Sequence, residues 1–598
     1  MGIRERLTQI RKKMEKSEID MYFVPTNDFH GSEYVSDYFK TREFLSGFDG
    51  SAGNMVITQK EAGLWTDGRY FLQAENQLAG TGITLYKSGQ EGVPTVNQYI
   101  ESNMPESGTF GVDGRMVSEA WVEGLKEMLA SKKAKVVLER DLAGEIWLDR
   151  PELRHEKAWI LPEEYTGESR MSKLQKLRQF LAEKGGGKMV FTSLDDIAWL
   201  LNIRGSDIPC NPVVLSYLVV EADNAFLFAG EGIFSVEDEG ALGSDGIVLK
   251  RYDEIYDYVR NFPEEEHIFV DKHAVNAIIV ENFPKNAKIV DTACPVTAWK
   301  AVKNSVEIQN ERKAHIRDGV AVTKFICWLK QNIDKMPLTE IKAAEKLEGF
   351  RREGKHYLGP SFEPIAGYAE HGAIVHYSAT PETDARLMPE NFLLLDTGGQ
   401  YLEGTTDVTR TILLGGKATS EQKKYYTAVL RGNLNLCAAK FIYGCSGVAL
   451  DYAARQPLWE MGCDYNHGTG HGVGYLLNVH EAPNAFRYRI LKEPGQNAVL
   501  EEGMITSDEP GIYLAGKYGI RLENLILCVK KEKNEFGQFM GFEPLTFVPF
   551  DRDAIDTEQM SQKELDYLND YHRQVYEKLE KYLSSEEKEW LADMCAPL

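Results

Sequence analysis

The stretch from Phe392 to Leu414, FLLLDTGGQYLEGTTDVTRTILL, constrains the fold of this chain more than any other. Its ends are apolar and its middle is rich in Gly and Thr, which predicts two antiparallel strands joined by a turn. Asp396 closes the first apolar run and Asp407 opens the second. In the right register, both carboxylates point at one spot, and burying them there costs several kcal/mol unless a cation lies between them. The pattern therefore indicates either a metal site or two separate aspartates that flank a turn.

The composition indicates several globular domains and argues against some functions. The chain has 598 residues, of which 43% are hydrophobic and 27% charged, enough for a large core. Its net charge of -23, without a long Lys/Arg run, argues against a nucleic-acid or anionic-membrane partner. No apolar run is long enough to cross a membrane, and the chain starts with a charged amphipathic helix rather than a signal peptide. The eight scattered cysteines lack a CxxC pair, which predicts reduced thiols in a cytoplasmic protein.

The N-terminal half alternates predicted strands and helices. Strand-like runs at 21–25, 54–58 and 64–67 precede or separate helical patterns at 70–79 and 118–133. The segment 149–167 contains two prolines and no periodicity, so we expect a linker there. A helix over 172–187, ended by three glycines, opens a second α/β segment that repeats the strand, turn, helix, loop and strand-pair order of the first. This echo predicts two related domains from a duplication.

A third, larger domain is expected after a boundary near 295–304. It opens with a long amphipathic helix predicted over 306–333. Histidines are concentrated in this domain between His356 and His480, and histidine is both a frequent metal ligand and the usual proton shuttle. The chemistry is therefore expected here, whereas the charged helical tail after Asp551 is expected to serve packing or oligomer formation.

Three histidines lie among glycines in the run NHGTGHGVGYLLNVHEAP, at His467, His471 and His480. Glycine lets the backbone approach a ligand closely. A run this rich in Gly and His is unlike an ordinary buried strand, because glycine weakens the interior of a strand. A single histidine of this kind would be interpreted as a core side chain whose polar group makes one hydrogen bond. Three together favour a site.

Two glutamates follow in strand-like sequence. Glu509 precedes Pro510-Gly511, and Glu523 lies in the alternating run GIRLENLILCV, where Arg521 and Glu523 share a face. One interpretation is a surface ion pair on an edge strand. The apolar LILCV that follows favours a buried Glu523 that needs a partner.

The candidate ligands together form an oxygen-rich set. Four carboxylates with one imidazole suit hard or borderline divalent ions such as Mn(II). Five ligands are too many for one catalytic zinc but suffice for two ions about 3.5–4 Å apart with a bridging hydroxide. The set comprises Asp396, Asp407, His471, Glu509 and Glu523.

The motifs DTGGQY…TTDVTRT, HGTGHGVG, SDEPGIY and GIRLEN resemble the pita-bread dinuclear metallopeptidases. FDGSAGNMVIT, LWTDGRYFLQA, IAWLLNIRG and HYSAT extend the likeness to the three-domain cytosolic Xaa-Pro aminopeptidases (aminopeptidase P) over essentially the whole chain. The resemblance implies a mixed α/β and α+β fold. Two related creatinase-N-like α/β domains, 1–155 and 156–300, would precede a pita-bread catalytic domain with a helical tail, 301–598.

The resemblance also implies the metal ligands and their roles. Asp407 and Glu523 would contact both ions, and Asp396, His471 and Glu509 would complete the set, with Glu509 as proton carrier. We expect two divalent ions, Mn(II) first, with Zn or Co as alternatives.

Five further positions match residues that act on substrate in this family. His376 and His480 match histidines that hold the substrate and stabilise the tetrahedral intermediate, and His467 is similar to a histidine of the proline pocket. Arg69 resembles an N-terminal-domain arginine that reaches the substrate, and Arg521 matches an arginine beside the ligands.

The implied activity is removal of the N-terminal residue from peptides whose second residue is proline, with a metal-held hydroxide attacking the scissile carbonyl. The nitrogen of an X-Pro bond carries no hydrogen, so such a site selects proline by ring shape. A prolidase, which cleaves dipeptides only, and a non-catalytic peptide-binding pita-bread module are the alternatives. The two N-terminal domains favour the aminopeptidase, and the intact ligand set disfavours the non-catalytic module. The resemblance further implies a cytoplasmic homodimer.

Overall fold

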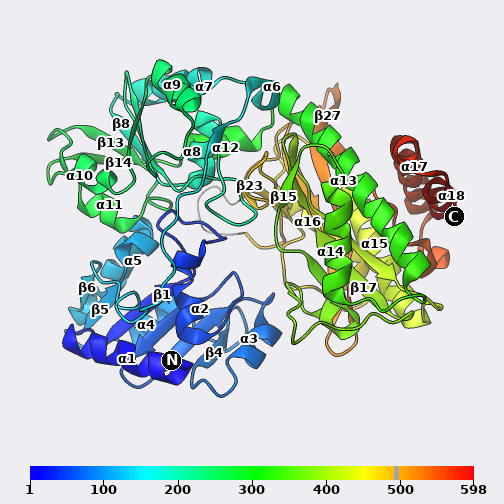
Figure 1. The fold of residues 1–598 in the computed structure, drawn as a ribbon, viewed down its shortest axis with the longest axis horizontal. Helices are drawn as coiled ribbons and strands as arrows, with labels where there is room; N and C mark the ends of the chain where they lie inside the picture. The colour runs from blue at the N-terminus through cyan, green and yellow to red at the C-terminus, as the bar shows by residue number, and fades with distance from the viewer. Residues whose placement is uncertain (491–496) are drawn as a thin grey trace. The chain divides into compact units, whose positions relative to one another are not determined.

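The computed structural model describes residues 1–490 and 497–598 (Figure 1). The chain forms two compact units. Unit 1 comprises Met1–Pro162 and Glu168–Val296, and unit 2 comprises Glu163–Gly167 and Thr297–Leu598. In the described parts of the chain, no helix combines the length and the apolar composition needed to cross a lipid bilayer.

Unit 1 contains two six-stranded sheets, each with helices packed on it. The first sheet has the order β4 (Thr84–Lys87), β3 (Ala62–Thr66), β2 (Asn54–Thr58), β1 (Met21–Pro25), β5 (Thr109–Val112) and β6 (Lys135–Val137). Its helices are α1 (Ile3–Lys16), α2 (Thr41–Ser46), α3 (Phe71–Gln77), α4 (Val96–Asn103) and α5 (Glu119–Leu129). Alternate residues of β1 enter two cores: Tyr22 and Val24 pack in the core that contains α1 residues, and Met21 and Phe23 in the core that contains α4 and α5 residues. The predicted strands 21–25 and 54–58 are confirmed.

The second sheet repeats the topology of the first. Its order is β12 (Ile247–Arg251), β11 (Ala225–Ala229), β10 (Tyr217–Val220), β8 (Lys188–Phe191), β13 (His267–Val270) and β14 (Lys288–Asp291). In both sheets the first strand, β1 or β8, pairs antiparallel on one side and parallel on the other. The helices are α7 (Arg170–Glu183), α8 (Leu194–Leu201), α9 (Val236–Ser244), α10 (Glu254–Arg260) and α11 (Ala277–Glu281). The two related α/β domains are therefore confirmed.

The segment expected to be an unstructured linker carries structure. It contains β7 (Trp159–Ile160), which pairs with β9 (Ile203–Arg204), and the short helix α6 (Glu163–Thr166). Residues 163–167 belong to unit 2, because the Thr166 carbonyl oxygen accepts a hydrogen bond from Asn304 Nδ2 at 2.8 Å. The linker prediction was wrong there because these partners are far away in the sequence.

Unit 2 is built from antiparallel sheets and long helices (Figure 1). The helices are α12 (Pro295–Ala301), α13 (Ser305–Asn332), α14 (Glu340–Arg352), α15 (Ser420–Cys437), α16 (Gly447–Trp459), α17 (Gln562–Leu579) and α18 (Ser585–Met594). The predicted helix over 306–333 is confirmed as α13, which begins at a capping box formed by Asn304 and Glu307.

Two sheets of unit 2 supply the residues of the candidate site. The three-stranded sheet has the order β16 (Ile365–Tyr368), β17 (Phe392–Thr397) and β20 (Val408–Leu413). The six-stranded sheet has the order β21 (Lys440–Ile442), β28 (Gly537–Pro544), β27 (Asn524–Asn534), β24 (Ile505–Asp508), β22 (Gly470–Gly472) and β23 (Glu481–Phe486). Smaller ladders join β15 (Tyr357–Pro360), β18 (Gly399–Tyr401) and β19 (Gly404–Thr405), and β25 (Gly511–Leu514) with β26 (Tyr518–Arg521).

The hairpin predicted at 392–414 exists, but its middle is more than a turn. Strands β17 and β20 pair antiparallel from Phe392 opposite Leu413 to Thr397 opposite Val408. Between them, β18 and β19 form a second ladder with β15. The Tyr401 hydroxyl donates to Asp318 at 2.9 Å, so the glycine-rich middle is anchored to α13.

The C-terminal tail packs in the core of unit 2. Leu568, Tyr571 and Val575 of α17 and Leu591 of α18 are buried in one cluster with residues of α15 and β26. The expected packing role of the tail is therefore confirmed, while a role in oligomer formation stays a prediction.

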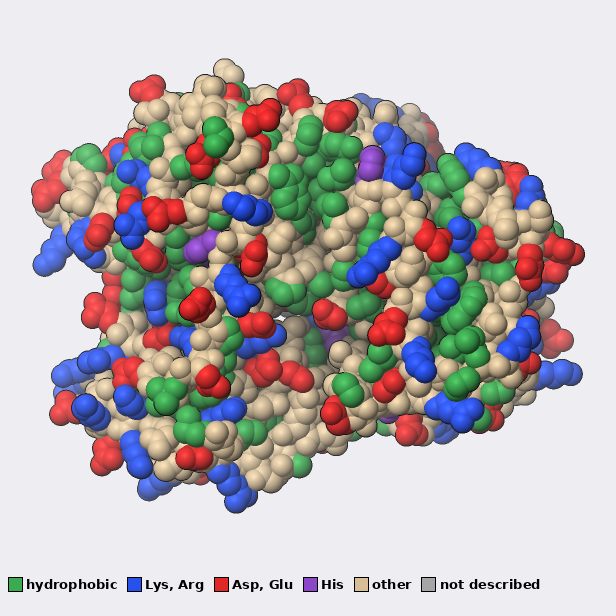
Figure 2. Space-filling model, viewed as in Figure 1, with side chains coloured by type: hydrophobic (Ala, Val, Ile, Leu, Met, Phe, Trp, Pro, Cys, Tyr) green, Lys and Arg blue, Asp and Glu red, His purple; other side chains and the backbone are tan. Residues whose placement is uncertain are grey.

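The surface carries mixed charges and one exposed group of aromatic rings. Figure 2 shows acidic and basic side chains interspersed on the face drawn. In unit 2, Tyr452 and Trp459 of α16 and Tyr488 after β23 are exposed. The ring centroid of Trp459 is 5.9 Å from that of Tyr452 and 5.9 Å from that of Tyr488. Exposed apolar groups of this kind favour contact with a partner.

Candidate metal centre

Asp396 and Asp407 are brought to one face of the three-stranded sheet by strand register. Asp396 lies opposite Thr409 in the β17–β20 ladder. Asp407 precedes Thr409 by two residues, and side chains alternate along a strand, so the two carboxylates share a face. Both are buried, at 8% and 5% exposure. The same-face arrangement expected from the sequence is therefore present.

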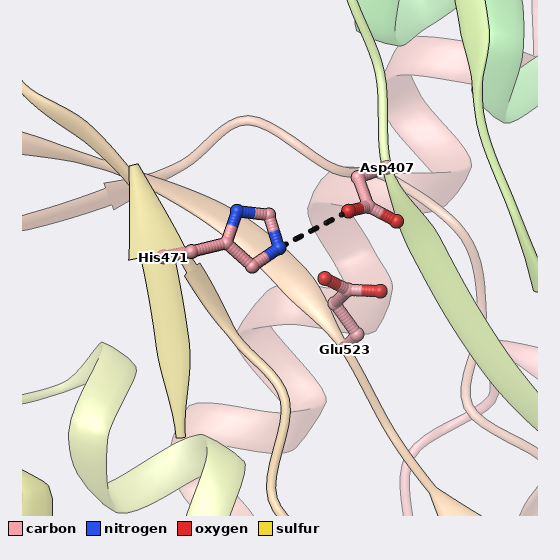
Figure 3. A group of neighbouring side chains, drawn as sticks. All are labelled: Asp407, His471 and Glu523. Atoms are coloured by element: carbon pink, nitrogen blue, oxygen red, sulfur yellow. Dashed lines mark ion pairs between the residues drawn. The ribbon is translucent and has the colours of Figure 1, made fainter. Parts of the chain in front are cut away.

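His471, from β22 of the six-stranded sheet, and Glu523, directly before β27 of that sheet, reach the same point (Figure 3). One ligand atom from each of Asp407, His471 and Glu523 lies within 4.8 Å of the others. His471 Nε2 is 3.5 Å from Asp407 Oδ2. Its Nδ1 lies 2.8 Å from the Gly472 carbonyl oxygen, which can only accept, so Nδ1 carries the proton and Nε2 is free to act as a ligand.

Glu509 and Asp396 adjoin this trio. Glu509 follows β24, its amide donates to the Thr469 carbonyl oxygen at 2.8 Å, and its Oε1 is 3.7 Å from His471 Nε2. Asp396 is close enough for its charge to raise the pKa of both Asp407 and Glu523. The structure thus brings together all five candidate ligands.

Several carboxylate oxygens of this site accept no hydrogen bond from the protein itself. Among the described residues, no hydrogen-bond donor reaches the buried Oδ1 atoms of Asp396 and Asp407 or Oε1 of Glu523. Burial, and then the charge of neighbouring carboxylates, raises the pKa of Asp407 and of Glu523 well above the ordinary range. Buried carboxylate oxygens that lack donors and repel one another fit the binding of cations. The residues present therefore fit a divalent metal site.

Burial and the charge of Glu523 also raise the pKa of Glu509 to about 7, although His471 and Arg521 oppose the shift. A carboxyl group with a pKa near neutrality can both take up and release a proton during turnover. This value belongs to the site without metal ions, whose positive charge would lower it.

Arg521 supplies positive charge beside the carboxylates. It is 1% exposed and forms an ion pair with Asp396. Its Nη1 donates to the Tyr513 hydroxyl at 2.7 Å, so that hydroxyl is left to donate to His467 Nε2 at 2.8 Å. A chain of contacts therefore runs from Asp396 through Arg521 and Tyr513 to His467.

The histidines predicted to act on substrate lie around the centre. The ring of His480 packs edge-on against that of His471, with 4.3 Å between centroids. His376 follows Val375, whose carbonyl oxygen accepts from Arg521 Nη2 at 3.3 Å. His467 is reached through Tyr513. Each of the three histidines is thus connected to the candidate ligands, either directly or through neighbouring residues.

Arg69 lies in unit 1, in the turn between β3 and α3. Its guanidinium forms a two-point ion pair with Asp67, at 2.9 Å and 2.8 Å. The expected position at a strand-to-helix turn is therefore confirmed. Its action on substrate stays a prediction.

Two participants were missed by the sequence analysis. The Thr409 hydroxyl donates to Glu523 Oε2 at 2.9 Å and lies 3.3 Å from Arg521 Nε, and Tyr513 links Arg521 with His467. Thr409 has a signal in the sequence, since it shares a strand face with Asp407. Tyr513 has none, because its role depends on contacts with distant segments.

Models of known families match nearly the whole chain. The model of metallopeptidase family M24 matches residues 309–530, and that of its C-terminal region matches 538–598. Two models of the creatinase/prolidase N-terminal domain match residues 6–140 and 149–307.

Several named proteins are similar over nearly the whole of this chain. The chain is 37% identical to "Xaa-Pro aminopeptidase 1" of Dictyostelium discoideum, covering 100% of this chain and 97% of the relative. It is 38% identical to "Aminopeptidase P2" of Arabidopsis thaliana, with 99% and 88% covered. The crystal structure of an X-prolyl aminopeptidase from Caenorhabditis elegans, described as a cytosolic enzyme with a di-nuclear active site, superposes with a TM-score of 0.95 at 33% identity, covering 100% of both chains. The fold and site thus define a pita-bread metallopeptidase, and the chain belongs to metallopeptidase family M24.

Proposed function

We propose that this protein is a metalloaminopeptidase that removes the N-terminal residue from peptides with proline in the second position. The observation that carries the proposal is the group formed by buried Asp407, buried Glu523 and half-buried His471, with carboxylate oxygens that the described protein leaves without donors. Similarity over 99–100% of this chain to proteins named Xaa-Pro aminopeptidase supports the choice of substrate.

The site is proposed to hold two divalent metal ions. Asp396, Asp407, His471, Glu509 and Glu523 would be the ligands, and their oxygen-rich character favours Mn(II), with Zn or Co as alternatives. When bound, these ions would supply a metal-held water of lowered pKa and would polarise the scissile carbonyl.

The protein's own residues are proposed to move the proton and hold the substrate. Glu509, which lies beside His471, takes a proton from the water and delivers it to the leaving nitrogen. His376 and His480 stabilise the developing oxyanion. His467, whose imidazole is hydrogen-bonded to Tyr513, packs against the proline ring of the substrate. Arg69 is proposed to bind carbonyl groups or the carboxylate of longer peptides.

The decisive experiment compares three substrates on the metal-loaded protein. An aminopeptidase of this type cleaves a tripeptide X-Pro-Y and leaves X-Ala-Y intact. Preference for the dipeptide X-Pro over X-Pro-Y would instead identify a prolidase, and tight peptide binding without cleavage would identify a non-catalytic module. Asp396→Asn and Glu523→Gln should abolish cleavage with the fold retained, and near-normal turnover of either variant without metal would exclude the dinuclear mechanism.

We further propose a cytoplasmic homodimer with three domains, 1–155, 156–300 and 301–598. None of the described cysteines forms a disulfide, which agrees with a reducing compartment. The exposed rings of Tyr452, Trp459 and Tyr488 are the surface we assign to self-association. Light scattering of the protein and of a Tyr452→Ala/Trp459→Ala variant tests this, because the variant should shift towards monomer.

A further inference from the structure

Glu340 is a fully buried carboxylate whose oxygens are all used. It is the first residue of α14 and is 0% exposed. Its Oε1 accepts from the Tyr368 amide at 2.7 Å and from His371 Nδ1 at 2.9 Å. Its Oε2 accepts from the Tyr377 hydroxyl and from the Ala385 amide, both at 2.9 Å. One side chain thus connects α14 with the last residue of β16 and with three residues of the segment that follows it.

That segment has little regular structure of its own. Between β16 and β17, all of whose intervening residues are described, the chain forms the short 3-10 helix η4 (Ala369–Ala373) and one isolated antiparallel bridge, between Arg386 and Thr339. Backbone without a ladder or a long helix depends on side-chain contacts for a fixed course. Backbone bonds to 338–340 hold the segment near Arg386, and the bonds to the Glu340 side chain hold it further towards β16, at His371 and Tyr377.

His376 lies in this segment between two anchored neighbours. On one side, the Val375 carbonyl oxygen accepts from Arg521, which is paired with Asp396. On the other side, the Tyr377 hydroxyl is bonded to Glu340, and the Tyr377 ring is buried in a small core. The backbone of His376 is thus fixed relative to the metal centre at one side and to α14 at the other.

We propose that Glu340 is a positioning residue for His376, acting through the hydroxyl of Tyr377. This inference rests on the proposed function, in which His376 contacts the substrate. Catalytic groups must be held to within a fraction of an ångström, and a displacement of about 1 Å can cost about 10²-fold in rate. Loss of the hydrogen bond between Tyr377 and Glu340 should therefore lower turnover while the ligands of the metal centre remain in place.

The test is a double-mutant cycle on the full chain loaded with metal. Glu340→Gln and Tyr377→Phe are each made in the wild-type protein and in the His376→Ala variant. In the wild-type background each should lower kcat by about 10-fold with a smaller change in KM, and in the His376→Ala background by less than about twofold. Tyr368→Phe is the matched control, since it keeps the amide that binds Glu340 and loses only a hydroxyl bonded to the Glu390 carbonyl oxygen. It should behave as wild type.

A second measurement does not depend on activity. Hydrogen exchange at the amide of Ala385, which donates to Glu340, should accelerate in Glu340→Gln and stay unchanged in Tyr368→Phe. If Glu340→Gln fails to fold, Tyr377→Phe carries the kinetic test, because it removes one hydroxyl and retains the ring.

The outcomes separate this inference from the proposed function. Equal losses in both backgrounds, or full activity of Tyr377→Phe and Glu340→Gln, overturn the positioning role alone. Full turnover of His376→Ala overturns the role of His376 in the proposed function, and with it this inference.

Discussion

Thr409 and Glu523 are joined by two hydrogen bonds. The Glu523 amide donates to the Thr409 carbonyl oxygen at 3.1 Å, and the Thr409 hydroxyl donates to Glu523 Oε2 at 2.9 Å. Glu523 lies in the gap between β26 and β27, so no strand ladder holds its backbone. The pair therefore sets the direction of the Glu523 carboxylate, whose Oε1 no donor reaches among the described residues.

The first prediction follows from that pair. Thr409→Val removes the hydroxyl and keeps the shape and the main-chain bond, so metal affinity should fall about 10–100-fold. Titration with a metal-buffered indicator measures it. Thr323→Val is the control, because the buried Thr323 hydroxyl of α13 has no hydrogen-bond partner among the described residues. Equal affinity of Thr409→Val and wild type would contradict the role assigned to the hydroxyl.

Metal binding should release protons. Burial and neighbouring carboxylates raise the pKa of Asp407 and of Glu523, so the metal-free site retains protons that a metal ion must displace. Metal affinity should accordingly rise as pH increases. Calorimetric titration in buffers of different ionisation enthalpy counts the released protons, and Asp407→Asn should release fewer. Binding without any proton release would refute the raised pKa values.

His376→Ala and His480→Ala should each lower turnover about 10²–10³-fold if these side chains stabilise the developing oxyanion. Metal content should stay at the wild-type level, as measured by elemental analysis. His356→Ala is a histidine control in the same unit, where His356 is bonded to Glu403 instead. Unchanged turnover in either site variant would remove that histidine from the mechanism.

Arg69→Ala should weaken binding of longer X-Pro peptides by about 1.5–3 kcal/mol, the range for a charged hydrogen bond, and leave metal content unchanged. Arg115→Ala provides a matched control, because Arg115 forms the same two-point ion pair with the residue two positions before it, Asp113. Steady-state kinetics on a tripeptide and a longer peptide decide the matter. If Arg69→Ala loses nothing on either substrate, the N-terminal domains serve stability or assembly.

His572 and His315 should each contribute a loss of unit 2 stability as the pH falls below about 6.5, the ordinary pKa of histidine, a contribution opposite in sign to that of the buried carboxyls with raised pKa. Burial, then the charges of Arg410 and Arg552, lowers the pKa of His572 to about 3, and burial lowers that of His315 to about 4. In that range the unfolded chain binds protons that the folded chain does not, so each histidine removes up to about 1.4 kcal/mol per pH unit. Denaturant titrations at several pH values measure the slope. His572→Asn should make it shallower, and an unaltered slope would speak against a neutral His572.

The metal ligands could be predicted from the sequence because their positions follow from patterns over a few residues. Asp396 and Asp407 follow from the period of two in β17 and β20, which the structure reproduces. Glu523 was expected inside a continuous strand, yet the strand is interrupted at 522–523, where contact with Thr409 replaces the ladder. Links of this kind join segments far apart in the chain. No local pattern specifies them, and the same holds for Tyr513 and for the β18–β19 ladder.

The short segment at 163–167 has a consequence for dissecting the chain. The polypeptide passes between the two units after Pro162, after Gly167 and again after Val296. A single protease cut at any one of these points leaves the units covalently connected through the other two. A fragment that starts at Thr297 would also lack the Thr166 and Tyr165 carbonyl oxygens, which accept from Asn304 and Tyr475. The catalytic unit is therefore not separable as one continuous stretch, and an isolated version needs residues 163–167 restored, as a graft or as an added peptide.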